Sequence, residues 1–350
     1  MHYITRKDIL TDLFPNEKKY RVEQLERALF NVGYKSWLDV SSLPLMVRQK
    51  IQDKIPWTTF HQTKILESKD HSAYKAILTC ADNNMIETVM MRNARRYWTI
   101  CLSAQIGCAM SCAFCATGKM GFIRNLTSDE IIDQYRFWKI FLHQNEMTVN
   151  SITNIVFMGM GEPLENYENV KYAIERILKY TNIGMTKITV STVGLLPNLE
   201  KILEDNTWPD VRIALSLHSA HPDTRKKIVP STSQNYLSRL ATWIENYGKK
   251  YGNRQHYITL EYVMLKDVND SLRDAQLLQR FAAKLGRIRI NLIPYNSTNS
   301  QFTETSPEHI NKFFLYLKKN GIDVTVRRSY GQDINAACGQ LIALNKKTLV

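Results

Sequence analysis

The chain has 350 residues, enough to bury a large core, and no run of about 18 apolar residues that would cross a membrane. Lysine and arginine total 46 against 33 aspartate and glutamate residues, which gives a net charge of +13. This excess favours RNA or DNA as a partner, although a generically basic soluble protein has the same balance. Six cysteines, three of them clustered, and an N-terminus without a signal peptide predict a cytoplasmic protein that uses thiols for metal or redox chemistry.

Residues 1–75 are expected to be mostly helical. Within them, Val22, Leu25, Leu29 and Phe30 share one face of a helix. This pattern predicts a small helical accessory domain, which either docks a substrate or stabilises the rest of the chain.

Two strand-like runs follow, at 73–79 and 85–91, with an Asp-Asn-Asn turn between them, and they predict a hairpin. From residue 97 onward, β-rich runs alternate with helical ones. The expected strands are 97–103, 152–158, 187–192, 211–217, 257–264 and 288–292, and the expected helices are 128–145, 167–181, 197–205, 233–250, 271–285 and 307–320. Six such repeats indicate a parallel sheet, either an α/β barrel short of the usual eight units or an open doubly wound sheet. A further strand at 323–328 precedes a glycine-containing tail.

Three cysteines, Cys108, Cys112 and Cys115, have the spacing C-x3-C-x2-C in a loop after the first strand of this region. Three thiolates hold three irons of a [4Fe–4S] cluster and leave the fourth iron open for a ligand. The alternatives are a zinc site that lacks a ligand and three unrelated core thiols. Zinc usually takes a fourth ligand close by, whereas the next histidine, His143, lies beyond a helical segment.

Polar residues follow several of the expected strands, and the carboxyl ends of parallel strands meet at one rim. Beside an open iron, the segment 159–163 (Gly-Met-Gly-Glu-Pro) suits S-adenosylmethionine, because Glu162 pairs with a cationic amine. A tight turn with a helix-capping acid is the alternative. Small polar groups that suit the carboxylate, ribose and adenine, or that simply bond at strand ends, are Ser191, Thr192, Ser216, His218 and Asn296.

Two cysteines outside the cluster motif, Cys101 and Cys338, are either reactive or inert buried thiols, and Cys80 is expected to be inert. Local basic clusters include residues 225–227 and 327–328. Each is either a contact for phosphates or a solvated face.

Six motifs occur in a fixed order: 107–115 around the three cysteines, 158–164 (Met-Gly-Met-Gly-Glu-Pro-Leu), 216–218 (Ser-Leu-His), 261–265 (Glu-Tyr-Val-Met-Leu), 291–296 (Asn-Leu-Ile-Pro-Tyr-Asn) and 336–341 (Ala-Ala-Cys-Gly-Gln-Leu). Together they resemble the radical S-adenosylmethionine (SAM) RNA adenine methyltransferases of the RlmN/Cfr family. The similarity runs from about Glu87 to Leu341.

This resemblance implies a radical SAM domain at residues 76–350. Its core is a partial (β/α)6 barrel, which the hairpin precedes and an active-site tail closes. Cys108, Cys112 and Cys115 would ligate the cluster. The positions that match SAM contacts in the family are Gly161, Glu162, Ser191, Ser216, Leu217, His218 and Asn296.

The resemblance also implies a reaction that consumes two SAM molecules per methylation. Cys338 matches the cysteine that first accepts a methyl group, and a radical made from a second SAM activates that methyl for addition to adenine. Cys101 matches the thiol that releases the protein–RNA adduct through a transient disulfide, and Glu87 matches the proton acceptor.

The expected product is adenine methylated at carbon 2 in 23S rRNA and in the tRNA anticodon loop. Methylation at carbon 8 of the same rRNA adenine, as in the resistance branch, is the alternative, and Pro163 resembles the carbon-2 branch. A non-catalytic RNA-binding protein with an iron–sulfur cluster or zinc is a third possibility. An external one-electron reductant such as flavodoxin or ferredoxin and a monomeric state are also expected.

Overall fold

A ten-stranded sheet organises the fold of the computed structural model, which describes residues 5–15, 19–93, 95, 97–147, 151–252, 257–298 and 300–341. In this part of the chain the strand order is β1-β2-β3-β4-β7-β8-β9-β10-β11-β12. Seven neighbouring strands are parallel: β4 (Trp98–Cys101), β7 (Ile152–Phe157), β8 (Ile188–Thr192), β9 (Arg212–Ser216), β10 (Ile258–Met264), β11 (Ile288–Pro294) and β12 (Val324–Val326). This arrangement confirms the expected α/β fold with a partial barrel.

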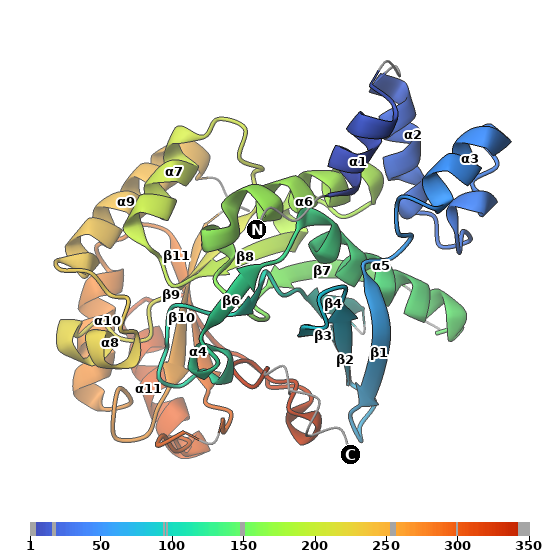
Figure 1. Ribbon diagram of the computed structural model, residues 1–350. Helices are drawn as coiled ribbons and strands as arrows, with labels where there is room; N and C mark the ends of the chain where they lie inside the picture. The colour runs from blue at the N-terminus through green and yellow to red at the C-terminus, as the bar shows by residue number, and fades with distance from the viewer. Residues whose placement is uncertain are drawn as a thin grey trace.

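Helices cover the outer face of the parallel strands (Figure 1). They are α5 (Ser128–Gln144), α6 (Tyr167–Tyr180), α7 (Leu196–Glu204), α9 (Tyr236–Tyr251), α10 (Leu272–Ala282) and α11 (Pro307–Lys319). The short helix α8 (Pro222–Ile228) instead packs against the cysteine loop, where the Ala113 N–H donates to the Ile228 carbonyl. Every helix expected in this region is present, and α8 is an addition that sequence patterns did not predict. Within the described residues, no helix combines the length and the apolar character that crossing a membrane requires.

The loop between β4 and α5 carries the three clustered cysteines. It contains a two-stranded hairpin, β5 (Gln105–Gly107) with β6 (Phe122–Asn125), and the short helix α4 (Ala116–Lys119). The hairpin closes the base of the loop, because its strands pair antiparallel at either end of the cysteine segment.

The predicted hairpin before the barrel is confirmed as β2 (Ala73–Cys80) and β3 (Met85–Arg92), and β3 pairs antiparallel with β4. Strand β1 (Phe60–Glu67), however, lies in the range expected to be helical and pairs with β2 at the edge of the sheet. Most of its side chains are exposed, so it lacks the alternating apolar pattern that predicts a strand. Among the described residues, the N-terminal α-helices therefore end at Gln52 instead of continuing toward residue 75.

The N-terminal helices α1 (Arg6–Leu13), α2 (Lys19–Leu29) and α3 (Leu45–Gln52) have a small apolar core of their own and lie at one end of the molecule beside α5 and α6 (Figure 1). Trp37 is fully buried in this core and donates to the Ile55 carbonyl at 2.7 Å. The buried Arg6 joins the helices to α5, because its guanidinium donates to Asp133 at 2.6 and 3.1 Å.

Asp133 is the anionic centre of this junction, since the Arg136 guanidinium also contacts it. Burial alone raises the pKa of Asp133, but Arg6 and Arg136 outweigh burial and lower it to about 2. A depressed pKa contributes stability above the unfolded value of about 3.9, and that contribution is lost as the pH falls through about 2. The attachment of the N-terminal helices is therefore expected to weaken in acid.

Replacing Asp133 with asparagine is expected to destabilise the protein by about 3–5 kcal/mol, because two buried guanidiniums lose their shared counter-charge. The midpoint of urea unfolding reports this change. Glu200→Gln is the matched control, since its pair with Arg239 is half exposed and its loss should leave the midpoint unchanged. Equal midpoints for both variants would contradict a structural role for Asp133.

Candidate active site

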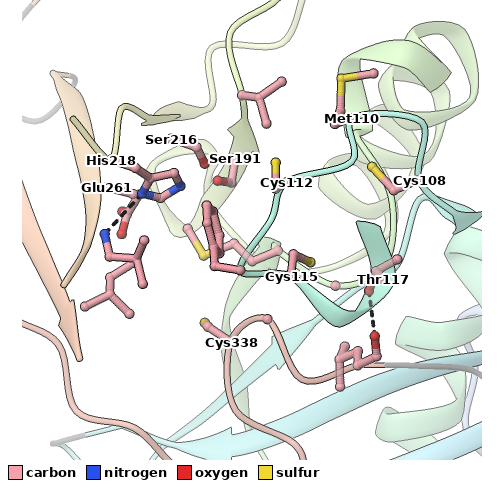
Figure 2. A pocket seen from close by; sticks show the side chains of 18 of the residues that line it. Cys108, Met110, Cys112, Cys115, Thr117, Ser191, Ser216, His218, Glu261 and Cys338 are labelled. Atoms are coloured by element: carbon pink, nitrogen blue, oxygen red, sulfur yellow. Dashed lines mark hydrogen bonds between the residues drawn. The ribbon is translucent and has the colours of Figure 1, made fainter. Parts of the chain in front are cut away.

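A cavity lies at the carboxyl ends of the parallel strands, between the cysteine loop and the C-terminal segment. Figure 2 shows three cysteines of one loop and Cys338 of a separate segment around this cavity. The predicted site residues that line it are Cys108, Cys112, Cys115, Gly161, Glu162, Ser191, Thr192, Ser216, His218, Asn296 and Cys338. Eleven residues spread over 231 positions of sequence therefore share one space.

The three clustered cysteines lie in a largely buried loop. Burial raises the pKa of Cys108 to about 12 and also raises the pKa values of Cys112 and Cys115. Such thiols ionise when a cation binds them, as iron does in a cluster. Among the described residues, no three His, Cys, Asp or Glu side chains gather closely enough to hold a single metal ion. Three cysteines of one loop that line the same cavity fit a cluster that takes one thiolate on each of three irons.

Glu162 is a buried carboxyl group presented by a turn that requires glycine. Gly161 has φ +95°, and a Cβ there would lie 2.4 Å from Cβ of Gln105. The Glu162 side chain accepts from the Val193 N–H at 2.8 Å and the Leu164 N–H at 3.1 Å. Burial nevertheless raises the pKa of Glu162 to about 7. A bound cationic amine would favour its ionised form, so this turn fits the amino group of SAM.

His218 is held as a neutral ring beside this turn. Its Nδ1 accepts from the Val263 N–H at 3.1 Å (Figure 2), and its ring packs edge-on against Phe114 with centroids 4.7 Å apart. Burial and, to a lesser degree, Arg225 lower its pKa to about 3. The neutral ring therefore carries its proton on Nε2, which is a hydrogen-bond donor.

The C-terminal segment that carries Cys338 is fastened from two sides. Ala116 N–H donates to the Gly339 carbonyl at 2.8 Å, and the Thr117 hydroxyl donates to the Leu341 carbonyl at 2.6 Å (Figure 2). On the other side, the Asn296 amide donates to the Cys338 carbonyl at 3.3 Å. Cys338 is thus held between the short helix after Cys115 and the loop after β11.

Cys101 and Glu87 do not line the cavity but lie on one face of the sheet beside it. Cys101 pairs with Val89 across β3 and β4, and Glu87 is two residues before Val89, so the three side chains share a face. Burial raises the pKa of Cys101 to about 12; Cys338 adds to the rise and Arg327 opposes it. The thiols of Cys101 and Cys338, both free, are therefore neighbours close enough to interact electrostatically.

Leu217 and Cys80 lie away from this chemistry. Leu217 is fully buried in the main core and does not line the cavity, so a ligand could meet only its backbone. Cys80 is also fully buried, and burial raises the pKa of its thiol, as expected for an inert core residue.

Sequence patterns missed several charged residues of the site. Arg225, expected in a phosphate-binding or solvated cluster, is instead buried on the Tyr236 ring and donates to the Val193 carbonyl at 2.8 Å. Arg327 lines the cavity, 3.8 Å from Glu261 Oε2. The sequence could have identified Arg327 as a site residue from its position at the end of the expected strand 323–328, because functional side chains gather at strand ends in parallel folds.

The fold and the cysteine-lined cavity together define a radical SAM protein, and the family model for the radical SAM superfamily matches residues 102–278. A probable dual-specificity RNA methyltransferase RlmN from Chlorobium phaeobacteroides is 38% identical over 93% of this chain and 90% of its own length. A dual-specificity RNA methyltransferase RlmN from Alcanivorax borkumensis is 36% identical over 93% of this chain and 85% of its own. Within the superfamily, the chain belongs to the RlmN family.

A solved structure supports the same assignment. The radical SAM methyltransferase from Sphaerobacter thermophilus superposes with a TM-score of 0.88 and 34% identity, covering 97% of this chain and 98% of its own. The similarity therefore includes the N-terminal helices and the C-terminal segment, as well as the barrel.

Proposed function

We propose that the protein is a radical SAM methyltransferase that methylates carbon 2 of adenine in 23S rRNA and in tRNA. The relatives named above are dual-specificity RNA methyltransferases, and the net charge of +13 suits an RNA substrate. The observation that carries the proposal is the pair of free thiols, Cys101 and Cys338, beside a cavity lined by three more cysteines.

The cavity residues would bind the cofactors. Cys108, Cys112 and Cys115 would hold three irons of a [4Fe–4S] cluster, and Glu162 would bind the amino group of SAM. When bound and reduced, the cluster supplies the electron that converts SAM into a 5′-deoxyadenosyl radical. The carboxylate, ribose and adenine of SAM would be bound by the remaining polar positions, Ser191, Ser216, His218 and Asn296, together with the backbone of Leu217.

Cys338 would carry the methyl group. Its sulfur attacks the methyl carbon of one SAM, the carbon–sulfur bond of the sulfonium breaks, and S-adenosylhomocysteine leaves. Once that methyl has lost a hydrogen atom, its carbon bonds to carbon 2 of adenine and tethers the RNA to Cys338. An aromatic adenine carbon is a poor partner for polar methyl transfer, so the tether supplies proximity for a radical addition.

Glu87 and Cys101 would complete the reaction. The unpaired electron of the ring would return to the oxidised cluster, and the Glu87 carboxylate would accept the carbon-2 proton. Cys101 then attacks the sulfur of Cys338, so that a disulfide forms and the sulfur–carbon bond breaks. The electron pair goes to the methylene carbon, which takes up a proton and becomes the methyl group of the product. Each cycle consumes two SAM molecules, and we propose that a flavodoxin or ferredoxin supplies electrons to a monomeric enzyme.

Mass spectrometry of nucleosides from cells with and without the gene tests this function. We expect 2-methyladenosine in both 23S rRNA and tRNA only when the gene is present. Finding only 8-methyladenosine would assign the protein to the carbon-8 reaction, although Pro163 favours carbon 2. If the reconstituted protein made no 5′-deoxyadenosine from SAM and a reductant, the radical mechanism itself would fail.

Glu162→Gln is expected to weaken SAM binding by about 10- to 100-fold, because a charge-assisted hydrogen bond to the amino group is lost. Equilibrium dialysis with labelled SAM and the cluster-loaded protein measures the change. Glu165→Gln, three residues further on and exposed, is the matched control and should bind SAM normally. Equal affinities for SAM in the two variants would show that Glu162 does not bind SAM.

A further inference from the structure

Lys75 is a buried lysine on β2 that contacts two parts of the site at once. Its Nζ lies 3.1 Å from Oε1 of Glu87 and donates to the Asn335 carbonyl at 3.1 Å. The residue is only 5% exposed and Glu87 only 1%. A buried ammonium costs several kcal/mol unless it is paired and hydrogen-bonded, so both contacts are needed to keep this lysine inside the protein.

The sheet register places this ion pair on the same face as Cys101. Lys75 is opposite Val89 in the β2–β3 ladder, and Val89 is opposite Cys101 in the β3–β4 ladder. The other face of β3 packs differently, since the Thr88 hydroxyl donates to the Cys101 carbonyl and accepts from Trp138 on α5. Lys75, Glu87 and Cys101 therefore lie on the same face of three neighbouring strands, with Val89 between Lys75 and Cys101.

The contact between Lys75 and the Asn335 carbonyl joins this face of the sheet to the segment that carries Cys338. Asn335 has φ +51° and lies three residues before Cys338. The Lys69 N–H donates to the Asp333 carboxylate of the same segment at 2.9 Å, and the Gln332 amide donates to the Asn296 side-chain oxygen at 2.7 Å. In Figure 1 the red segment that precedes residue 342 lies near strand β2, in agreement with the contact between Lys75 and Asn335. The Lys75 ammonium thus contacts both Glu87, the expected proton acceptor, and the segment that carries Cys338, the expected methyl carrier.

We propose that Lys75 is a positioning residue that holds the Glu87 carboxylate in place relative to the segment bearing Cys338. The inference rests on the proposed function, in which Glu87 accepts the carbon-2 proton of an adenine tethered to Cys338. The ammonium pairs with the carboxylate and fixes its direction, while the Asn335 contact keeps the tethered base in reach. A misplacement of about 1 Å costs a proton transfer roughly 100-fold.

The two halves of the reaction depend on Lys75 to different degrees. Methylation of Cys338 needs SAM and the C-terminal segment but no proton acceptor for adenine. That segment also contacts Asn296, Ala116 and Thr117, and none of these contacts involves Lys75. Removal of the carbon-2 proton needs Glu87 in place. Loss of Lys75 should therefore slow the second half and spare the first.

The test compares Lys75→Met with wild type and with Lys64→Met, which removes an exposed lysine from the adjacent strand β1. Peptide mass spectrometry measures the methylated fraction of Cys338, and nucleoside analysis measures RNA methylation in the same samples. For Lys75→Met we expect iron content and Cys338 methylation within about twofold of wild type, and RNA methylation about 10- to 100-fold slower. Deuterium at carbon 2 of the substrate adenine should slow this variant further, and Lys75→Arg, which keeps the charge, should recover part of the rate.

Two results would overturn the inference. One is RNA methylation by Lys75→Met at the wild-type rate. The other is a loss of Cys338 methylation in the same proportion as RNA methylation, which would make Lys75 only an anchor of the C-terminal segment. If Lys75→Met is insoluble, the same two comparisons are made with Lys75→Gln, which also removes the charge, so that a wild-type rate or a parallel loss in this variant overturns the inference in the same way. A wild-type protein that methylates no RNA would refute the proposed function instead, so the two failures are distinguishable.

Discussion

Replacing Cys338 with alanine is expected to abolish RNA methylation, with a loss on the order of 10³-fold or more, while iron content and reductive cleavage of SAM stay within about twofold of wild type. The sulfur of Cys338 is the proposed methyl carrier, and alanine offers no atom that could replace it. The proposed cluster ligands are three other cysteines of the same cavity, which this replacement leaves unchanged. Iron analysis, 5′-deoxyadenosine formation and nucleoside mass spectrometry measure the three quantities.

Cys80→Ala is the matched control for this experiment, because it removes a fully buried thiol that lies away from the cavity. It should retain RNA methylation. Loss of iron from Cys338→Ala would mean that Cys338 is a cluster ligand, and unchanged RNA methylation would mean that the methyl group takes another route.

Replacing Cys101 with alanine is expected to leave the RNA covalently bound to the protein. Without the second thiol, the sulfur–carbon bond between Cys338 and the adenine has no internal nucleophile to break it. Release of methylated RNA should then fall by about 100-fold or more, since an intramolecular attack is replaced by none. A denaturing gel with labelled RNA measures the adduct, and mass spectrometry locates it on Cys338.

This adduct should resist dithiothreitol, because it is a thioether and contains no disulfide. Cys80→Ala should form no lasting adduct, and Cys101→Ala with Cys338→Ala should form none either. Release of methylated RNA from Cys101→Ala at the wild-type rate would show that Cys101 has no part in the reaction.

The barrel and the cluster loop were predictable because both depend on local patterns. Strands buried on two faces appear as short apolar runs, and helices between them have their own period, so the alternation from residue 97 predicted the α/β fold. Cys108, Cys112 and Cys115 lie within eight residues, and their spacing alone indicates metal chemistry. The cavity then brings Glu162 and His218 to the same place, as expected from the strand ends that they follow.

Buried charges were not predictable, because their burial depends on partners far away in the sequence. Lysine and arginine are almost always exposed, so Arg225 was expected at a surface. Nothing in the hairpin sequence indicates that Lys75 is buried, because its carbonyl partner Asn335 is 260 positions away. Strand β1 was missed for a related reason, since pairing with β2 at the sheet edge stabilises it with few buried side chains.

The isotopic composition of the product tests the central claim most directly. The wild-type protein is given RNA, a reductant and SAM whose methyl group is CD3. The methyladenosine product is then isolated, and mass spectrometry measures its molecular mass. The proposed mechanism predicts 2-methyladenosine with two deuterium atoms, because one is removed from the methyl group on Cys338 and a solvent proton replaces it. A product that keeps all three deuterium atoms would contradict this mechanism, since the methyl group would then have reached the base intact.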